Sequence, residues 1–69
     1  MKSSELLRRV RRLASRRDWK IEITEGKRHT KLRLPGGDTT IPRHSTDLKT
    51  GTLHHILKQL GITPEDLED

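Results

Sequence analysis

Residues 19–34 read WKIEITEGKRHTKLRL, and this stretch decides the fold. Apolar and polar side chains alternate over residues 19–24 and again over residues 29–34. A period of two is typical of strands that bury one face. Residues 25–28 contain a glycine and connect the two segments. The stretch therefore predicts a β-hairpin with one apolar face.

A helix is expected before the hairpin, over residues 3–17. Its apolar side chains recur at helical spacing, and Ser3 or Ser4 is expected to cap its first turn. Asp18 is expected to end it, because aspartate tolerates turn geometry better than most residues. Arginines fill the outer face and last turns of this helix. A solubilising surface and contact with a phosphate backbone account for them equally well.

A third strand and a second helix are expected after the hairpin. The turn signal Pro-Gly-Gly-Asp at residues 35–38 leads into a short strand over residues 39–41, which a proline ends. Residues 50–60 carry apolar side chains at helical spacing. Thr50 is the expected cap of this helix, and Gly61 is the expected stop.

The order of elements is α-β-β-β-α, which predicts an α+β fold with a three-stranded antiparallel sheet. Both amphipathic helices are expected to cover one face of the sheet and to leave the other face open. The 69 residues allow one small domain, residues 1–69, with a thin core. A short acidic tail, residues 63–69, is expected to begin with one further helical turn.

Charge is unevenly distributed along a chain whose net charge is +5. Residues 1–33 hold twelve basic and four acidic side chains, whereas residues 34–69 hold three basic and six acidic ones. A basic half favours phosphate polymers or acidic proteins as partners. The chain has no cysteine, and its longest apolar runs are two residues. We therefore expect a cytoplasmic protein without disulfides, thiolate metal sites or a membrane span.

His29 is the first candidate for chemistry, because imidazole takes and gives a proton near neutral pH, with an unperturbed pKa of about 6.5. The alternation places His29 on the polar face of its strand with Lys31 and Arg33, next to Lys27 and Arg28 of the connection. A lone histidine after a turn is commonly an ordinary surface residue. The surrounding cations favour the functional interpretation.

The tripeptide Pro42-Arg43-His44 is the second candidate. A guanidinium beside an imidazole, just past a strand end, is suited to hold a phosphate and assist proton transfer. The same tripeptide also fits an ordinary solvated loop. As a bare motif it is weak, and the solvated interpretation is the simpler one.

Two adjacent histidines, His54 and His55, fall on the outer face of the second helix. Adjacent positions on a helix do not converge on one metal ion, so we interpret both as solvated. No paired acids and no helical His-x-x-x-His motif accompany them. The sequence therefore predicts neither a metal site nor any other cofactor.

Five short motifs follow one another along the chain. They are SSEL at 3–6, GKRHTKLR at 26–33, IPRH at 41–44, GTL at 51–53 and ILKQLG at 56–61. Each motif alone is weak, but their order and spacing resemble the HicA-type toxins of bacterial HicA/HicB toxin-antitoxin systems. Asp18 stands where these toxins often have a glycine. Lys27 and Arg28 stand where they commonly have small or neutral residues.

The resemblance implies a fold similar to double-stranded RNA-binding domains, an mRNA-cleaving endonuclease activity, and neutralisation by a HicB-type antitoxin. The catalytic histidine of the family falls on His29. We expect His29 to act as general base on a ribose 2′-hydroxyl, with nearby cations stabilising the developing charge and no metal ion required. The candidate phosphate-binding residues are Lys27, Arg28, Lys31, Arg33, Arg43 and His44.

Two other functions remain open at this point. A non-catalytic module of the same fold would grip duplex RNA by its shape and phosphates, through the arginine-rich helix. An adaptor would dock its basic face on an acidic protein and show only salt-sensitive attraction to RNA. Cleavage of RNA by the purified protein separates these functions. The oligomeric state is also open, with a monomer expected.

Overall fold

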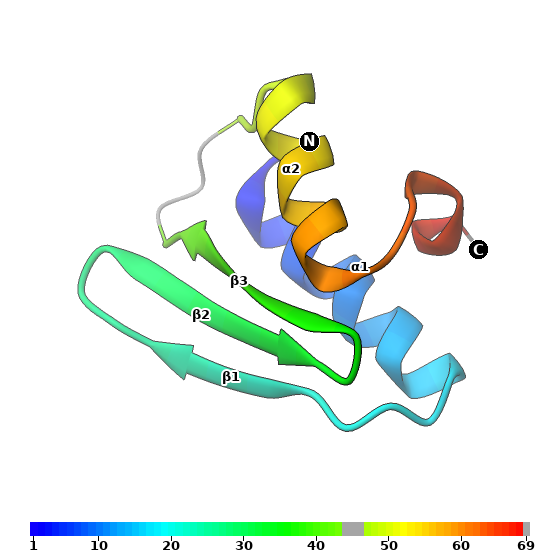
Figure 1. Ribbon diagram of the computed structural model, residues 1–69. Helices are drawn as coiled ribbons and strands as arrows, with labels where there is room; N and C mark the ends of the chain where they lie inside the picture. The colour runs from blue at the N-terminus through cyan, green and yellow to red at the C-terminus, as the bar shows by residue number, and fades with distance from the viewer. Residues whose placement is uncertain (44–46, 69) are drawn as a thin grey trace.

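The computed structural model describes residues 1–43 and 47–68. The predicted order α-β-β-β-α is confirmed, and the strands form one antiparallel sheet in the order β1-β2-β3 (Figure 1). The elements are α1 (Ser3–Arg16), β1 (Glu22–Glu25), β2 (His29–Leu34), β3 (Gly37–Pro42), α2 (Thr50–Leu60) and the 3-10 helix η1 (Pro64–Leu67).

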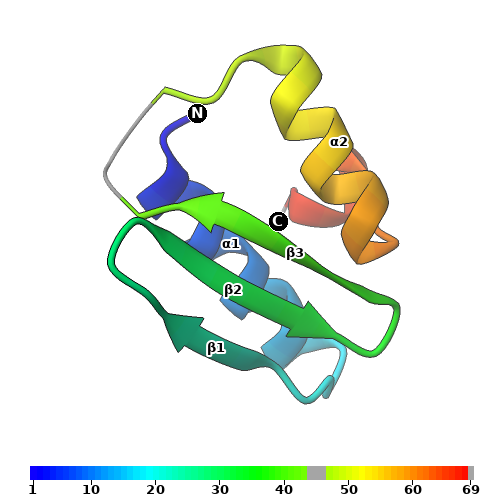
Figure 2. The same ribbon diagram turned by 60° about the vertical axis from the view of Figure 1, so that its left-hand side comes forward.

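The sheet has one apolar and one polar face, as the alternation predicts. Ile23, Leu32 and Thr39 share a cross-strand row on the face that meets the core. Viewed from the polar face, α1 lies behind the sheet and α2 lies on the side of β3 (Figure 2). We call the polar face the open face. His29 lies at one end of it. The next row across the strands consists of Thr24, Lys31 and Thr40, and the row after that consists of Glu22, Arg33 and Asp38.

A single apolar core joins both helices and η1 to the sheet. Its large side chains are fully excluded from solvent, so truncating any one of them to alanine costs about 2–5 kcal/mol. This core supports the sheet from one side only and leaves the open face free. The largest fully buried side chains are Leu6, Val10, Leu13, Leu32, Ile41, Leu57 and Leu60.

The turn between β2 and β3 touches the last turn of α2. A Cβ atom on Gly37 would overlap the carbonyl oxygen of Gln59, and one on Gly36 would lie 3.0 Å from the carbonyl oxygen of Leu60. Only glycine lets two backbones approach so closely. The hydroxyl of Thr39 also donates a hydrogen bond of 2.6 Å to Oε1 of Gln59. These contacts fix α2 against β3.

The residues that cap the two helices differ from the prediction. The N-cap of α1 is Lys2 and that of α2 is Lys49, and neither side chain makes a capping hydrogen bond. The serine and threonine expected as caps, Ser3 and Thr50, are instead the first helical residues. Lys2 pairs with Asp47 in an isolated antiparallel bridge, so pairing between distant segments positions the start of α1. Gly61 does end α2, in the left-handed region at φ 76°.

The first strand of the hairpin begins later than predicted, whereas β2 spans residues 29–34 as predicted. β1 begins at Glu22, so Trp19 lies outside the strand, half-buried against the core rather than fully buried. The reason is the end of α1, where Asp18 adopts a φ of 55° and Trp19 N–H donates to the carbonyl of Ala14 at 2.8 Å. β3 is longer than residues 39–41, because it pairs with β2 along its whole length.

The expected helical turn of the tail is confirmed as η1. Thr63 caps it, with the Thr63 hydroxyl accepting from Asp66 N–H and the Asp66 carboxylate accepting from Thr63 N–H. Leu67 is buried in the core. The tail is therefore part of the folded structure at least through Leu67.

Candidate functional site

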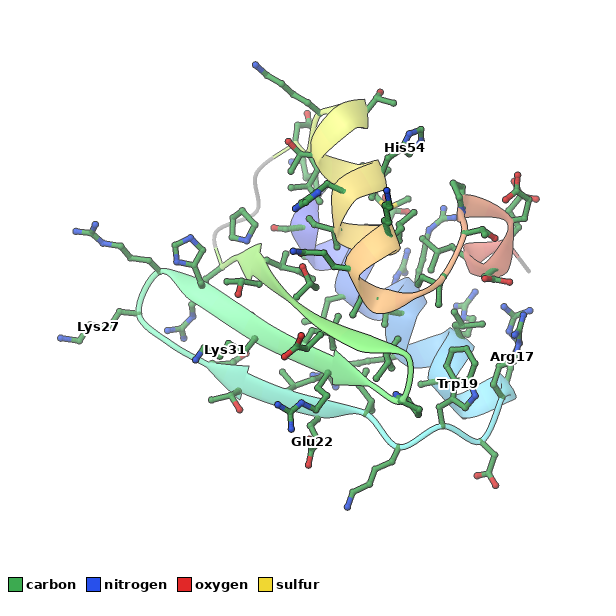
Figure 3. The ribbon with its side chains drawn as sticks, viewed as in Figure 1. Arg17, Trp19, Glu22, Lys27, Lys31 and His54 are labelled. Carbon is green, nitrogen blue, oxygen red and sulfur yellow. The ribbon has the colours of Figure 1, made fainter. Side chains whose placement is uncertain are left out.

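His29 is the first residue of β2, and its side chain is exposed on the open face. The connection from β1 closes through a hydrogen bond of 2.8 Å from Gly26 N–H to the carbonyl of His29. A Cβ atom on Gly26 would lie 3.1 Å from that same oxygen, which makes glycine the best fit. Lys27 and Arg28 form the tip of the hairpin, and Lys27 points away from the body of the molecule (Figure 3).

Arg43 braces this hairpin tip from the end of β3. Its backbone N–H donates to the carbonyl of Arg28 at 2.9 Å, and its Nη1 donates to the carbonyl of Gly26 at 2.8 Å. Its Nη2 also lies 4.0 Å from a carboxylate oxygen of Glu25. Sequence analysis missed this bracing role, because it depends on a contact between residues 17 positions apart. The Arg43 side chain remains 47% exposed and therefore accessible to a ligand.

Three cations around His29 have no acidic partner in the described part of the chain. Lys27, Arg28 and Lys31 are all exposed, and none of them forms an ion pair with residues 1–43 or 47–68. Lys31 stands one row from His29 on the same face of β2, between two threonines of the neighbouring strands. Positive charge is thus concentrated around the imidazole without internal neutralisation.

Arg33 has a different environment from the other predicted phosphate ligands. Its guanidinium lies 3.7 Å from a carboxylate oxygen of Glu22 and 3.8 Å from one of Asp38, on the strands to either side. This cross-strand acidic cluster of Glu22, Arg33 and Asp38 carries one positive and two negative formal charges. Arg33 is therefore less available to a phosphate than Lys31, although both lie on the same strand face.

A groove of about 790 Å³ separates the open face from α2. Its floor is formed by polar residues of the three strands, and its wall by His55 and Gln59 of α2. The prediction that His55 is solvent-exposed is confirmed. Its place on the groove wall was missed, because it follows from how closely α2 approaches β3. His54 is also exposed but points away from the sheet, beside a smaller hollow (Figure 3).

The arginines of α1 are largely engaged with acidic groups of the chain itself. Arg9 lies 3.3 Å from a carboxylate oxygen of Glu5, and Arg17 lies 2.9 Å from one of Asp66. Arg16 donates to the backbone carbonyl of Asp66 at 2.7 Å. Hydrogen bonds to Thr63, foremost from its backbone, together with Arg17, lower the pKa of Asp66. The acidic tail is thereby held on the basic end of α1.

Several expectations concern residues or groups away from this face. His44 lies outside the described residues. Within residues 1–43 and 47–68, no three His, Asp or Glu side chains gather as possible metal ligands. No helix in the same residues is long and apolar enough to cross a membrane.

Comparison with known proteins identifies the family. The family model described as the HicA toxin of bacterial toxin-antitoxin systems matches residues 7–62. The comparisons with curated proteins and with solved structures gave no match. The matched segment includes the hairpin, His29 and all of α2. Toxins of such systems are paired with an antitoxin. Since the match covers well over half of the 69 residues, the chain belongs to the HicA family of bacterial toxins.

Proposed function

We propose that this toxin is an endoribonuclease that cleaves mRNA, with His29 as the general acid and base. The observation that carries the proposal is the position of His29 at the end of β2. There the imidazole faces solvent on the open face, among unpaired cations at Lys27, Arg28 and Lys31. A cluster of cations attracts a phosphate backbone irrespective of its sequence. The imidazole adds the proton transfer that cleavage requires.

The reaction starts at a ribose 2′-hydroxyl. His29 takes the hydroxyl proton, and the 2′-oxygen attacks the adjacent phosphorus in line. The bond from phosphorus to the 5′-oxygen of the next nucleotide breaks, and the protonated His29 gives its proton to that departing oxygen. The products are a 2′,3′-cyclic phosphate and a free 5′-hydroxyl. Lys27, Arg28, Lys31 and Arg43 stabilise the charge that develops on the phosphate. The mechanism requires no metal ion.

The partner that inhibits this site is a HicB-type antitoxin with an acidic contact surface. An exposed nuclease centre ringed by cations is the surface that an inhibitor most needs to cover. We propose that the free toxin is a monomer and that residues 1–69 act as one domain. Its place of action is the bacterial cytoplasm, where mRNA is translated.

The test compares the purified protein with two histidine variants on an RNA substrate. His29→Ala should lower the cleavage rate by about 10²–10⁴-fold, the usual contribution of general acid-base catalysis. The exposed side chain of His29 predicts little change in stability. His54→Ala, on the far side of α2, serves as the matched control with cleavage unchanged. A folded His29→Ala protein that cleaves like the wild type would falsify the mechanism.

The same assay separates the other two functions. A DNA copy of the substrate should resist cleavage, and EDTA should have little effect. Loss of activity in EDTA that magnesium restores would contradict the metal-free mechanism. Binding of duplex RNA without cleavage would instead indicate a non-catalytic module. Binding to RNA that is present at low salt and lost at 0.2 M salt would indicate an adaptor, because its attraction to RNA is only salt-sensitive.

A further inference from the structure

We propose that the groove between the open face and α2 binds the nucleobase next to the cleaved bond, and that Gln59 and His55 select it. The inference rests on the proposed ribonuclease function and names what its site recognises. The ligand is a nucleotide of single-stranded RNA whose base presents a carbonyl oxygen, as guanine, uracil and cytosine do and adenine does not. The volume of about 790 Å³ falls in the range of roughly 300–1,000 Å³ that is usual for ligand pockets.

The wall of the groove is held rigidly in place. The backbone carbonyl oxygen of Gln59 lies so close to Gly37 that a Cβ atom on residue 37 would overlap it. The side chain of Gln59 is fixed as well, because Thr39 donates a 2.6 Å hydrogen bond to its Oε1. A site whose polar groups are oriented before the ligand arrives discriminates better than a mobile one.

The fixed amide presents donors to the groove. Since Oε1 of Gln59 already accepts a hydrogen bond from Thr39, the Nε2 amino group is the part that remains for a ligand. No other hydrogen bond to the Gln59 side chain occurs within residues 1–43 and 47–68. His55 lies one helical turn earlier on the same face of α2 and is exposed. Two polar side chains thus point at the same space, and a carbonyl acceptor satisfies them.

The floor of the groove determines where the phosphates lie. Lys31 is flanked across the strands by the hydroxyls of Thr24 and Thr40, one row from His29. This row suits a phosphate or a ribose hydroxyl. Lys31 therefore links the groove to the nuclease centre and places the bound base beside the bond that is cleaved.

The acidic cluster closes the far end of the groove. Glu22 and Asp38 together outnumber the single guanidinium of Arg33, so a second phosphate would be repelled there. The RNA backbone is thereby kept at the Lys31 end, while a base, which carries no charge, enters the groove. The one Phe, Tyr or Trp side chain of the sequence is Trp19, which does not line the groove. Selection therefore relies on hydrogen bonds and not on stacking against an indole or phenyl ring.

The test maps cleavage positions by sequencing the RNA products of four proteins. They are the wild type, Gln59→Glu, His55→Ala and the control His54→Ala. In Gln59→Glu the carboxylate still accepts the Thr39 hydrogen bond, so the substitution removes the donors and adds one negative charge, which repels the phosphates of every RNA alike and leaves the ratio between bases to report the lost donors. We expect the preference for guanine and uracil over adenine to fall about three- to tenfold in Gln59→Glu and His55→Ala. The preference should stay unchanged in His54→Ala, and an unchanged preference in all three variants overturns the proposal.

A binding assay separates failure of this inference from failure of the proposed function. His29→Ala protein is titrated with labelled tetra-uridine and tetra-adenosine, and the affinities are measured by fluorescence anisotropy. Tetra-uridine should bind more tightly, and adding Gln59→Glu should abolish the difference. If the wild type cleaves no RNA, the proposed function is wrong. The titration still shows whether the groove binds uracil in preference to adenine. Equal affinities for the two oligonucleotides overturn the inference even when cleavage is observed.

Discussion

Asp18 is the one non-glycine residue with a positive φ among residues 1–43 and 47–68. An L-amino acid in the left-handed region pays about 1–2 kcal/mol, because its Cβ approaches the following carbonyl oxygen. Its carboxylate also stands at the C-terminal end of α1, where the helix dipole disfavours negative charge. The HicA-type toxins that the chain resembles often have glycine here, and the φ of 55° explains that preference.

Replacing Asp18 with glycine should therefore stabilise the protein. We expect Asp18→Gly to raise the free energy of unfolding by about 0.5–1 kcal/mol, after the greater entropy of glycine in the unfolded chain is subtracted. Urea denaturation at neutral pH measures the difference. Asp18→Asn removes the charge but keeps the Cβ atom, so its gain should be smaller. A glycine variant that unfolds at lower urea than the wild type contradicts the strain argument.

Among the elements, the contact between α2 and the hairpin turn does most to shape the groove. Sequence alternation predicted β2 and put His29, Lys31 and Arg33 on one face, because a strand fixes side-chain direction by its period alone. It did not predict the groove wall, since the position of α2 depends on how closely its backbone approaches Gly37. The helix caps were missed for a similar reason, as Lys2 is held by pairing with a distant segment.

The importance of this contact is tested at Gly37, with a second glycine at the other end of α2 as the control. Gly37→Ala should destabilise the fold by about 1–3 kcal/mol, because the new methyl group meets the backbone carbonyl of Gln59, which is not free to rotate away. Gly51→Ala is the control, since a Cβ at Gly51 meets nothing within 4 Å and alanine favours a helix. Thermal unfolding of both variants measures the change in stability that each substitution causes. Equal loss of stability in both would mean that the close approach is unimportant.

At the scale of the whole molecule, the two basic surfaces differ in how their charges are paired. The sequence suggested two basic surfaces, the arginine-rich helix and the hairpin. In the folded protein Arg8, Arg9 and Arg17 pair with the carboxylates of Glu5 and Asp66, while the hairpin tip keeps Lys27 and Arg28 unpaired. That difference was hidden in the sequence, because Asp66 and Arg17 are 49 positions apart. The hairpin tip is thus where a polyanion or an acidic protein meets the least competition.

Charge reversal at the two basic surfaces separates their roles. Lys27→Glu combined with Arg28→Glu should weaken both RNA cleavage and antitoxin binding, because one surface serves both ligands. The association rate with the antitoxin should fall about tenfold at low salt, and the effect should shrink as salt rises, since exposed charges are screened over roughly 8 Å at physiological ionic strength. Stopped-flow mixing at several salt concentrations measures it.

The matched control reverses the same number of charges on α1, with Arg8→Glu and Arg11→Glu, whose side chains are both exposed on the other side of the molecule. This variant should keep both activities nearly intact, because the sheet separates α1 from the open face. Loss of RNA binding in the α1 variant alone would instead favour a duplex-RNA module that binds through its helix. If the hairpin variant loses cleavage while the antitoxin still associates at the wild-type rate, the antitoxin binds elsewhere, and its inhibition must then act through a change in the toxin's conformation.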